Sequence, residues 1–172
     1  MGNILIQYLK KIDRVMIFSI MLSIITLAIS FFTGFNMKDS FVENHLELSF
    51  WDIFINNSIV SIMFFLGAIT FGLLNFIYLF INGYYIGTTF SYKISSEGLQ
   101  QTIDLVFWHG LLEVPSLILS SSLGFVPLLL VIFSAHSSKK IKIKKYLKYA
   151  VVVILLVFIL NALAALIEST TF

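Results

Sequence analysis

A histidine and a glutamate lie four residues apart in an apolar part of the second half of the sequence. His109 and Glu113 share one face if this segment is helical, because residues four apart are neighbours on a helix surface. Glu113 is the only acid within an apolar segment, and an ionisable group at membrane depth is costly and therefore indicates function. Pro115 leaves the carbonyl of Leu111 without its helical donor, which adds an acceptor nearby. The sequence thus predicts a polar site around Glu113.

Three chemistries fit this pair. The first is a hydrogen-bonded lock between two helices, with Asn82 as its third member. The second is the passage of protons or of a substrate amine through a groove. The third is acid/base or zinc-assisted hydrolysis, with Glu113 as base and His109 as metal ligand or acid. A hydrolytic zinc site usually needs three protein ligands, and His45 and His136 lie in other segments. We therefore expect no metal and no other cofactor, and a protein that is not an enzyme.

Small and polar residues also recur at helical spacing earlier in the chain. Asn75 and Asn82 lie in one row, which the Gly83 and Gly87 pair continues at GxxxG spacing. Such a row is typical of a helix-packing face in lipid, and it permits a homodimer. The alternative is a helix that breaks at Asn82 and Gly83 and exposes backbone groups to a ligand. The predicted polar cluster comprises Asn56, Asn75, Asn82, Gly83, Gly87, His109, Gly110 and Glu113.

The elements that position these residues must be membrane helices. Of the 172 residues 59% are hydrophobic, 12% are charged and 18 are Phe, which leaves too little polar surface to coat a soluble globule. Residues 15–35, 53–92 and 149–167 carry no charge, and each stretch is long enough for a spanning helix of roughly 20 residues. The absence of cysteine excludes disulfides and iron–sulfur clusters. No basic stripe with interleaved aromatic residues predicts nucleic-acid binding.

Lysine and arginine collect on the cytoplasmic side of membrane proteins and so predict the orientation. Arg14 and the lysines before it place the N-terminus inside, and the acidic segment 36–52 is expected outside. Six lysines place the loop before the last helix inside: Lys139, Lys140, Lys142, Lys144, Lys145 and Lys148. Alternatively, this run is a surface for anionic lipid or for an acidic partner subunit. We expect a multi-pass protein of the cell membrane with a cytoplasmic N-terminus and an outside C-terminus.

The apolar segment 105–138 must then enter and leave on one side, because Asp104 and Lys139 are both expected inside. Two helices of about 15 residues each fit within it, too short for a full crossing. The small residues Ser120–Ser122 and Gly124 predict the turn between them. The predicted fold is an all-α polytopic membrane bundle of five hydrophobic segments, with a re-entrant or short two-helix hairpin that forms a groove facing the cytoplasm. Its three full spans are expected at about 15–35, 54–82 and 149–167.

One series of these residues runs through the middle of the chain: Asn56-Asn57, Gly67, Gly72, Asn82-Gly83-x-x-x-Gly87, His109-Gly110-x-x-Glu113 and Gly124. The series resembles that of the stage II sporulation protein M family of multi-spanning membrane proteins. The family-like core is expected at about 53–138 of a single transmembrane domain, 1–172. The resemblance also implies the layout of five segments with the N-terminus inside. Pro115 and Ser120–Ser122 depart from the family pattern, in which alanine and glycine are commoner.

The resemblance implies a role beside other membrane proteins. The sporulation member works with peptidoglycan-degrading partners, and similar small members accompany circular-bacteriocin clusters or transport ATPases. We expect a non-enzymatic membrane subunit whose polar cluster forms a groove for a hydrophobic peptide, lipid or partner helix, in peptide maturation, export or immunity. Expected partners are membrane lipids and membrane proteins such as a transport ATPase or a peptide precursor. The alternatives are an intramembrane peptidase or ligase acting on a precursor peptide, and a scaffold of a sporulation or cell-envelope complex.

Overall fold

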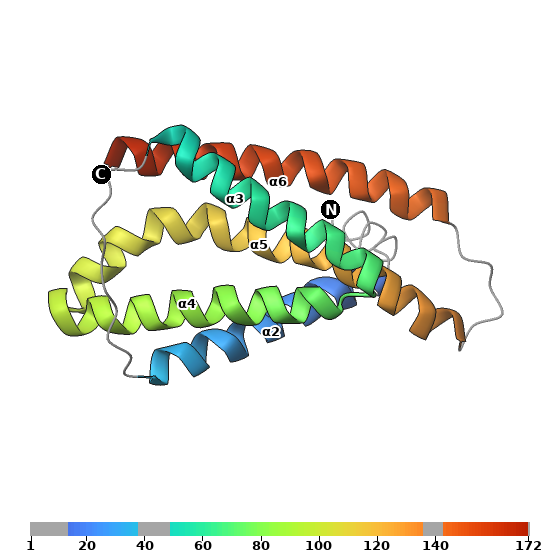
Figure 1. Ribbon diagram of the computed structural model, residues 1–172, viewed down its shortest axis with the longest axis horizontal. Coiled ribbons are helices and arrows are strands. Elements are labelled where there is room, and N and C mark those ends of the chain that lie inside the picture. Colours follow the sequence, from blue (N-terminus) through green and yellow to red (C-terminus); the bar gives the residue numbers. More distant parts are fainter. Residues whose placement is uncertain (1–13, 38–48, 136–142, 172) are drawn as a thin grey trace, which may run out of the picture.

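The computed structural model describes residues 14–37, 49–135 and 143–171. These residues form α-helices and one short 3-10 helix, with no strand among them: α2 Arg14–Asn36, α3 Phe50–Leu66, η1 Gly67–Thr70, α4 Leu73–Glu97, α5 Leu99–Ala135 and α6 Ile143–Thr171. The five α-helices lie along one another as an elongated bundle, and each runs from one end of it towards the other (Figure 1). The prediction of an all-α helical membrane bundle is confirmed.

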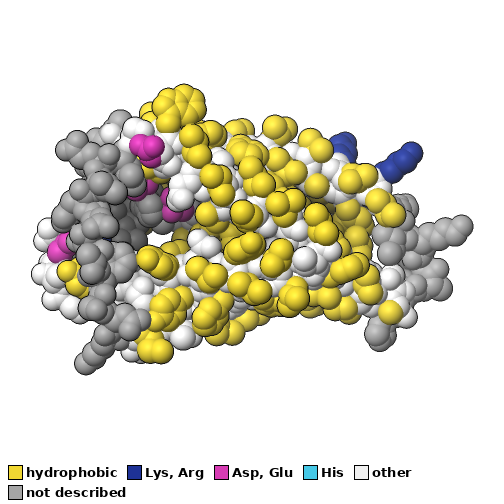
Figure 2. All heavy atoms as spheres, viewed as in Figure 1, with side chains coloured by type: hydrophobic (Ala, Val, Ile, Leu, Met, Phe, Trp, Pro, Cys, Tyr) yellow, Lys and Arg dark blue, Asp and Glu magenta, His cyan; other side chains and the backbone are white. Residues whose placement is uncertain are grey.

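The outer surface of the bundle is suited to lipid. Four helical stretches are long and apolar enough to cross a membrane: Arg14–Asn36, Phe50–Thr70, Gly110–Ala135 and Ile143–Ser169. Hydrophobic side chains cover the middle of the visible face, and the charged side chains that can be seen lie near the two ends (Figure 2). The helix α4 is not one of these four stretches, and it carries the asparagines and glycines of the predicted packing row. The chain is therefore a multi-pass membrane protein, and its least apolar helix packs mainly against α2.

The predicted single span 54–82 is wrong, because the chain turns back at residues 67–72. Phe71 and Gly72 have positive φ values of 51° and 82°, a backbone conformation that glycine adopts without steric cost. A Cβ atom added to Gly67 would lie 1.5 Å from Oδ1 of Asn75, so the glycine leaves room for this side chain at the start of α4. The turn makes α3 and α4 two antiparallel helices. Asn82 and Gly83 lie within the uninterrupted α4, and the predicted helix break there is also wrong.

The predicted hairpin at 105–138 is wrong as well, because α5 is one helix of 37 residues. The serines expected to form a turn are fully buried, and their hydroxyls donate to carbonyls of their own helix, as from Ser120 to Ser116 at 2.7 Å and from Ser121 to Leu117 at 2.7 Å. At 1.5 Å per residue the helix is about 55 Å long, more than one crossing requires. It bends along its length in Figure 1, as helices that contain prolines do, and its ends lie at opposite ends of the bundle.

Glycines bring α2 and α4 into close contact. A Cβ atom added to Gly87 would lie 2.1 Å from the carbonyl oxygen of Phe31, and one added to Gly34 would lie 2.1 Å from that of Tyr84. Ser30 reinforces this contact, since its hydroxyl donates to the Leu79 carbonyl at 3.2 Å. The GxxxG pair thus packs inside the chain, as the packing interpretation predicted. The face that the spacing offered to a homodimer is occupied by α2.

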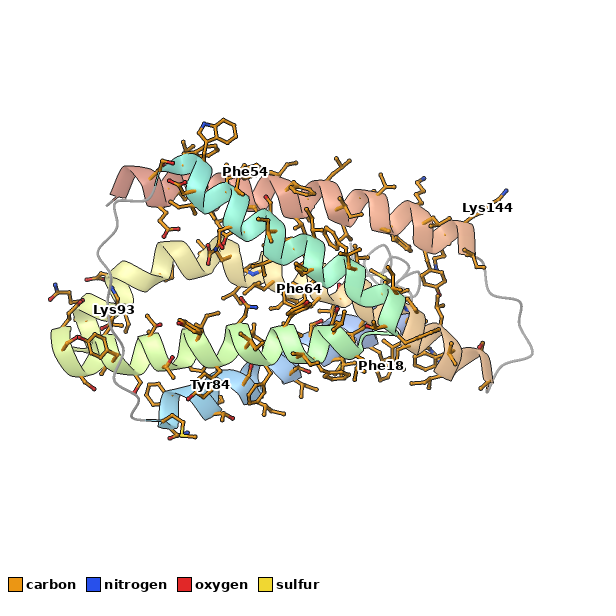
Figure 3. All side chains as sticks on the ribbon, in the orientation of Figure 1. Phe18, Phe54, Phe64, Tyr84, Lys93 and Lys144 are labelled. Carbon is orange, nitrogen blue, oxygen red and sulfur yellow. The ribbon has the colours of Figure 1, made fainter. Side chains whose placement is uncertain are left out.

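The turn between α3 and α4 is fixed to α5 by a buried asparagine. The Asn75 amide nitrogen donates to the Ser121 carbonyl at 2.7 Å, and the side chain is fully buried. A Cβ atom added to Gly124 would lie 2.0 Å from this amide nitrogen and 2.5 Å from the carbonyl oxygen of Phe64, so the backbone of α5 lies close to that of α3 here. Phe64 and Phe125 complete a core at this level, where Figure 3 shows Phe64 between the ribbons of α3 and α4. The helices are closely packed here, and we call this level the closed part of the bundle.

The rest of the bundle is less evenly packed. The helix α4 packs mainly against α2, whereas α3 packs mainly against α5 and α6. Among the described residues α4 and α6 do not contact each other, and α3 meets α4 mainly close to their common turn. Away from the turn, α4 is therefore separated from α3 and α6, and the separation lies on the side where α2 ends and α3 begins (Figure 1).

Candidate functional site

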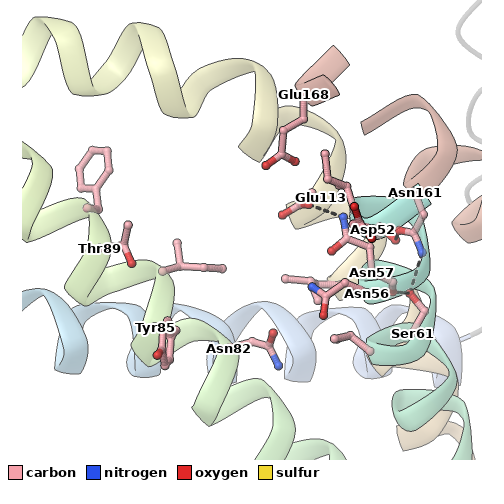
Figure 4. Close-up of a pocket in the computed structure, with 16 residues that line it drawn as sticks. Asp52, Asn56, Asn57, Ser61, Asn82, Tyr85, Thr89, Glu113, Asn161 and Glu168 are labelled. Carbon is pink, nitrogen blue, oxygen red and sulfur yellow. Dashed lines mark hydrogen bonds between the residues drawn. The ribbon is translucent and has the colours of Figure 1, made fainter. Parts of the chain in front are cut away.

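A cleft of about 680 Å³ occupies the space between α4 on one side and α3, α5 and α6 on the other. Eleven of the side chains that line it are polar: Asp52, Asn56, Asn57, Ser61, Asn82, Tyr85, Thr89, Glu113, Ser116, Asn161 and Glu168. Figure 4 shows α4 as one wall and most of the labelled polar groups on the wall opposite. A cavity of this size matches those that hold drug-sized ligands.

The first turn of α3 places the outermost acid of the cleft. Ser49 caps the helix, and its hydroxyl accepts a hydrogen bond from the Asp52 backbone N–H at 3.3 Å. The Asp52 carboxylate accepts a bond from the Ser49 backbone N–H at 3.0 Å, which completes a capping box. These bonds satisfy N–H groups that a helix start otherwise leaves without partners. The side chain of Asp52 is thereby held at the end of the bundle, next to the mouth of the cleft.

A chain of hydrogen bonds joins α3, α5 and α6 along one wall. The Asn161 amide nitrogen donates to the Ser61 hydroxyl at 3.0 Å, and the Ser116 hydroxyl donates to the Asn161 carbonyl oxygen at 2.5 Å. All three side chains are at most 2% exposed. The Asn57 amide nitrogen donates to Oε1 of Glu113, which connects α3 and α5 nearer the mouth of the cleft. Buried polar groups in a membrane need partners within the protein, and here the partners come from different helices.

The α4 wall of the cleft carries fewer polar side chains than the opposite wall. The Asn82 amide nitrogen donates to the Tyr78 carbonyl of its own helix at 2.7 Å. Asn57 rather than Asn82 therefore bonds to Glu113, and the predicted lock with Asn82 as third member is wrong. Tyr85 and Thr89 continue this wall towards the acidic end, with Ile86 and Phe90 beside them.

The structure brings only part of the predicted cluster together. Asn56, Asn82 and Glu113 line the cleft. Asn75 belongs to the closed part of the bundle, and Gly83 and Gly87 belong to the α2–α4 contact.

Gly110, another predicted site residue, does not line the cleft. Among the described residues, a Cβ atom added to Gly110 would meet nothing within 4 Å, so this glycine makes no close contact with the described part of the chain. His109 lies in α5, but its side chain is outside the described residues, and its predicted contact with Glu113 stays a prediction. The described residues contain no group of three or more His, Asp or Glu that could hold a metal ion.

The basic residues at the start of α6 lie far from the cleft. Lys144, Lys145 and Lys148 belong to the first turns of α6, at the end of the bundle opposite to Asp52, as Lys144 shows in Figure 3. Lys145 Nζ lies 5.6 Å from the ring centroid of Tyr149, which is within the range of a cation–π contact. The remaining lysines of this run, Lys139, Lys140 and Lys142, are outside the described residues. The prediction that the groove opens on the lysine side is therefore wrong.

Several cleft residues were missed by the sequence analysis. Asn161 had a clear signal, because it is the only amide side chain in the apolar segment 149–167. Asn57 was part of the family-like series, but the order of the chain does not reveal that it meets Glu113, 56 positions away. Glu168 directly follows the same apolar segment, at a position where a charge at the end of a span is ordinary.

The fold and the cleft define a multi-pass helical membrane protein with a polar cleft between its helices. The family model described as stage II sporulation protein M matches residues 15–171, and the chain belongs to this family. The match takes in all five α-helices and extends well beyond the 56–125 segment that carried the resemblance. The chain is 30% identical over 156 residues to an uncharacterized protein of Methanocaldococcus jannaschii, covering 81% of this chain and 88% of that protein. No solved structure matches.

Proposed function

We propose that this chain is a non-enzymatic membrane subunit that binds a ligand in the cleft between α3, α4, α5 and α6. The observation that carries the proposal is the position of Glu113. This acid lies inside a membrane-spanning stretch, takes a hydrogen bond from Asn57 and lines a cleft of about 680 Å³. An intramembrane acid facing a cavity is a functional feature by default, because it is costly to keep there.

A purely structural role explains the cleft less well. A lock between helices needs hydrogen bonds and close packing, and Asn75 provides both in the closed part of the bundle. Beside Glu113, α4 is instead separated from α3 and α6, although close packing of glycines and serines is available elsewhere in the same chain. Unfilled space costs contacts, so its presence beside a row of polar side chains supports a binding role.

The charges at the two ends of the bundle support an orientation. Arg14 and the lysines at the start of α6 lie at one end, and Asp52 and Glu168 lie near the other. The rule that basic residues remain in the cytoplasm supports a cytoplasmic N-terminus and an outside C-terminus. Five crossings agree with that arrangement. The mouth of the cleft faces the outside in this orientation.

The setting that we propose is peptide maturation, export or immunity of a bacteriocin-like kind, with a transport ATPase or a peptide precursor as membrane partner. The described part of the chain is almost wholly helix, and little of it extends beyond the bundle to hold a large soluble partner. A membrane subunit of this shape is suited to a ligand that enters from the membrane surface and carries apolar groups.

Native mass spectrometry of the full chain, extracted together with its own membrane lipids, tests the binding role. We expect a bound small molecule or peptide that is retained by the unmodified chain and lost in Thr89→Trp, because the indole fills the cleft. Ile81→Trp is the matched control, since Ile81 lies on the same helix but is 52% exposed and does not line the cleft. Identical bound species in all three proteins, each with unchanged helix content by circular dichroism, would count against the proposal.

A further inference from the structure

We infer that the ligand of this cleft is an apolar peptide segment in extended conformation, bound through the N–H and C=O groups of its backbone. This inference rests on the proposed function and specifies the ligand class of the same site. It starts from three uncharged polar side chains of the lining, Asn56, Asn82 and Thr89. Each of them has hydrogen-bonding groups that no other described residue takes up.

Polar side chains elsewhere in the bundle mostly have partners within the chain. Asn161 donates to the Ser61 hydroxyl and accepts from the Ser116 hydroxyl, so both ends of its amide are bonded. The Thr88 hydroxyl donates to the Tyr85 carbonyl of its own helix at 3.0 Å. Such bonds are needed because lipid tails offer no hydrogen-bond partners.

The three lining residues differ from this pattern. Among the described residues, neither the Asn56 amide nor the Thr89 hydroxyl has a hydrogen-bond partner. The Asn82 amide nitrogen is bonded to the Tyr78 carbonyl, but its Oδ1 accepts no bond from a described residue. Asn56 on α3 and Asn82 on α4 extend into the cleft from opposite walls (Figure 4). The cleft therefore offers an acceptor at Asn82, a hydroxyl at Thr89 and both kinds of group at Asn56.

These groups determine which ligands bind in place of water. A ligand that displaces bound water loses affinity unless it reproduces the hydrogen bonds of that water. It must therefore bring a donor for the Asn82 oxygen and an acceptor for the Thr89 hydroxyl. A peptide brings one donor and one acceptor with each residue, and an extended backbone leaves both available, whereas an α-helix uses them itself. The ester groups of an ordinary diacyl lipid only accept hydrogen bonds.

The spacing along α4 fits an extended chain. Asn82 and Thr89 are seven residues apart, so they share one face of the helix and lie about 10 Å apart along its axis. Three residues of an extended peptide cover the same length, at about 3.4 Å each. Ile86 on α4 lies between the two, and Val60 and Leu117 line the opposite wall. Successive side chains of an extended peptide point to opposite faces, so apolar ligand residues meet apolar surface on both sides.

Binding of probes to the full chain in nanodiscs of phosphatidylcholine, whose headgroup has no hydrogen-bond donor, tests this inference. The first probe is the peptide acetyl-Leu-Leu-Leu-amide. The second is the matched depsipeptide, in which esters replace both peptide bonds between leucines, so that two N–H groups are lost and the apolar side chains are kept. A short-chain ceramide, a lipid that contains an amide, is the third. We expect the peptide to raise the unfolding temperature and to bind about five- to fiftyfold more tightly than the depsipeptide.

Variants assign the effect to the lining. Thr89→Val and Asn56→Leu remove polar groups without a partner among the described residues, so we expect both proteins to fold and to bind the peptide about five- to fiftyfold more weakly. Asn82→Leu should weaken binding of the peptide but not of the depsipeptide, because the esters have no N–H for Oδ1 to accept. Thr33→Val and Asn36→Leu are the matched controls, since both residues lie on α2 outside the lining, and each should change binding by less than about twofold.

Equal binding of the peptide and the depsipeptide would overturn backbone recognition while the binding function stands. A response to the ceramide alone would overturn the peptide ligand and assign the amide to a lipid. Equal weakening by Thr89→Val and Thr33→Val would also overturn the inference, since the peptide would then bind outside the cleft. No response to any probe would overturn it as well, and the bound species in the native membrane would decide the proposed function separately.

Discussion

Substitution of Gly87 by alanine tests whether the cleft wall depends on the backbone contact between α2 and α4. The added Cβ atom would lie 2.1 Å from the carbonyl oxygen of Phe31 and 2.8 Å from the backbone nitrogen of Phe35, whereas ordinary contacts begin at 3.4 Å. The obstacles are backbone atoms, so no rotation of a side chain relieves them, and the two helices must separate by about 1 Å. We expect the free energy of unfolding to fall by about 1–3 kcal/mol, the usual cost of overpacking.

Gly110→Ala is the matched control, because the same atom added there meets nothing within 4 Å. Alanine should leave stability unchanged or raise it by up to about 1 kcal/mol, since glycine is the poorer residue inside a helix. Both changes are measured by unfolding of the full chain in mixed micelles with increasing denaturing detergent. The reasoning is refuted if Gly87→Ala is as stable as the unmodified chain, or if Gly110→Ala loses as much stability as Gly87→Ala.

Three further predictions concern the hydrogen-bonded wall, the orientation and the metal content. Asn161→Ala should lower the free energy of unfolding by about 1–3 kcal/mol, because it removes the partner of two buried hydroxyls, Ser61 and Ser116; a change below about 0.5 kcal/mol would show that the network is not stabilising. In intact cells a membrane-impermeant maleimide should label Met37→Cys but not Lys144→Cys, and the reverse pattern would invert the proposed orientation; the chain has no cysteine of its own to interfere. Purified protein should contain well below one zinc ion per chain by elemental analysis, and stoichiometric zinc would favour the hydrolytic alternative.

The membrane class and the glycine contact followed from sequence because each depends on a local property. A long segment that is apolar and uncharged lies in the membrane whichever other segments surround it. Gly83 and Gly87 are four residues apart, so their common face is set by helix geometry alone. The sequence did not predict that α2 packs against this face, because a row of small residues does not indicate which helix it contacts.

The two errors in the fold have different physical origins. The charge-free stretch 53–92 is long enough for one helix with a tilt or for two helices with a tight turn, and its composition does not distinguish them. The turn depends on Gly72, whose added Cβ would meet the ring of Phe125 at 2.5 Å, a contact between distant parts of the chain. The serines of α5 were interpreted as a turn, as they would be in water. In an apolar surrounding their hydroxyls bond to the helix itself, and the helix continues.

The sequence predicted part of the site and missed the rest, again because some of its contacts join distant parts of the chain. Glu113 is conspicuous in its segment, and its importance could be inferred from cost alone. The partners of Glu113 and Asn161 come from other helices and become apparent only when α3, α5 and α6 are placed side by side. The error in the facing of the groove followed directly from the hairpin, since one continuous helix moves Asp104 to the opposite end from the lysines.

The sharp turn at Gly67–Gly72 has a consequence for how the protein is made. The helix α4 lacks the apolar length that marks the other four as membrane spans, and it carries two asparagines and two glycines along its course. Alone it would partition poorly into a bilayer while it leaves the ribosome. Joined to α3 by only a few residues, it can be inserted as the second arm of a preformed pair, with α2 already in place to receive its glycines. Lengthening that connection should therefore reduce the yield of correctly integrated protein before it affects the stability of the finished bundle.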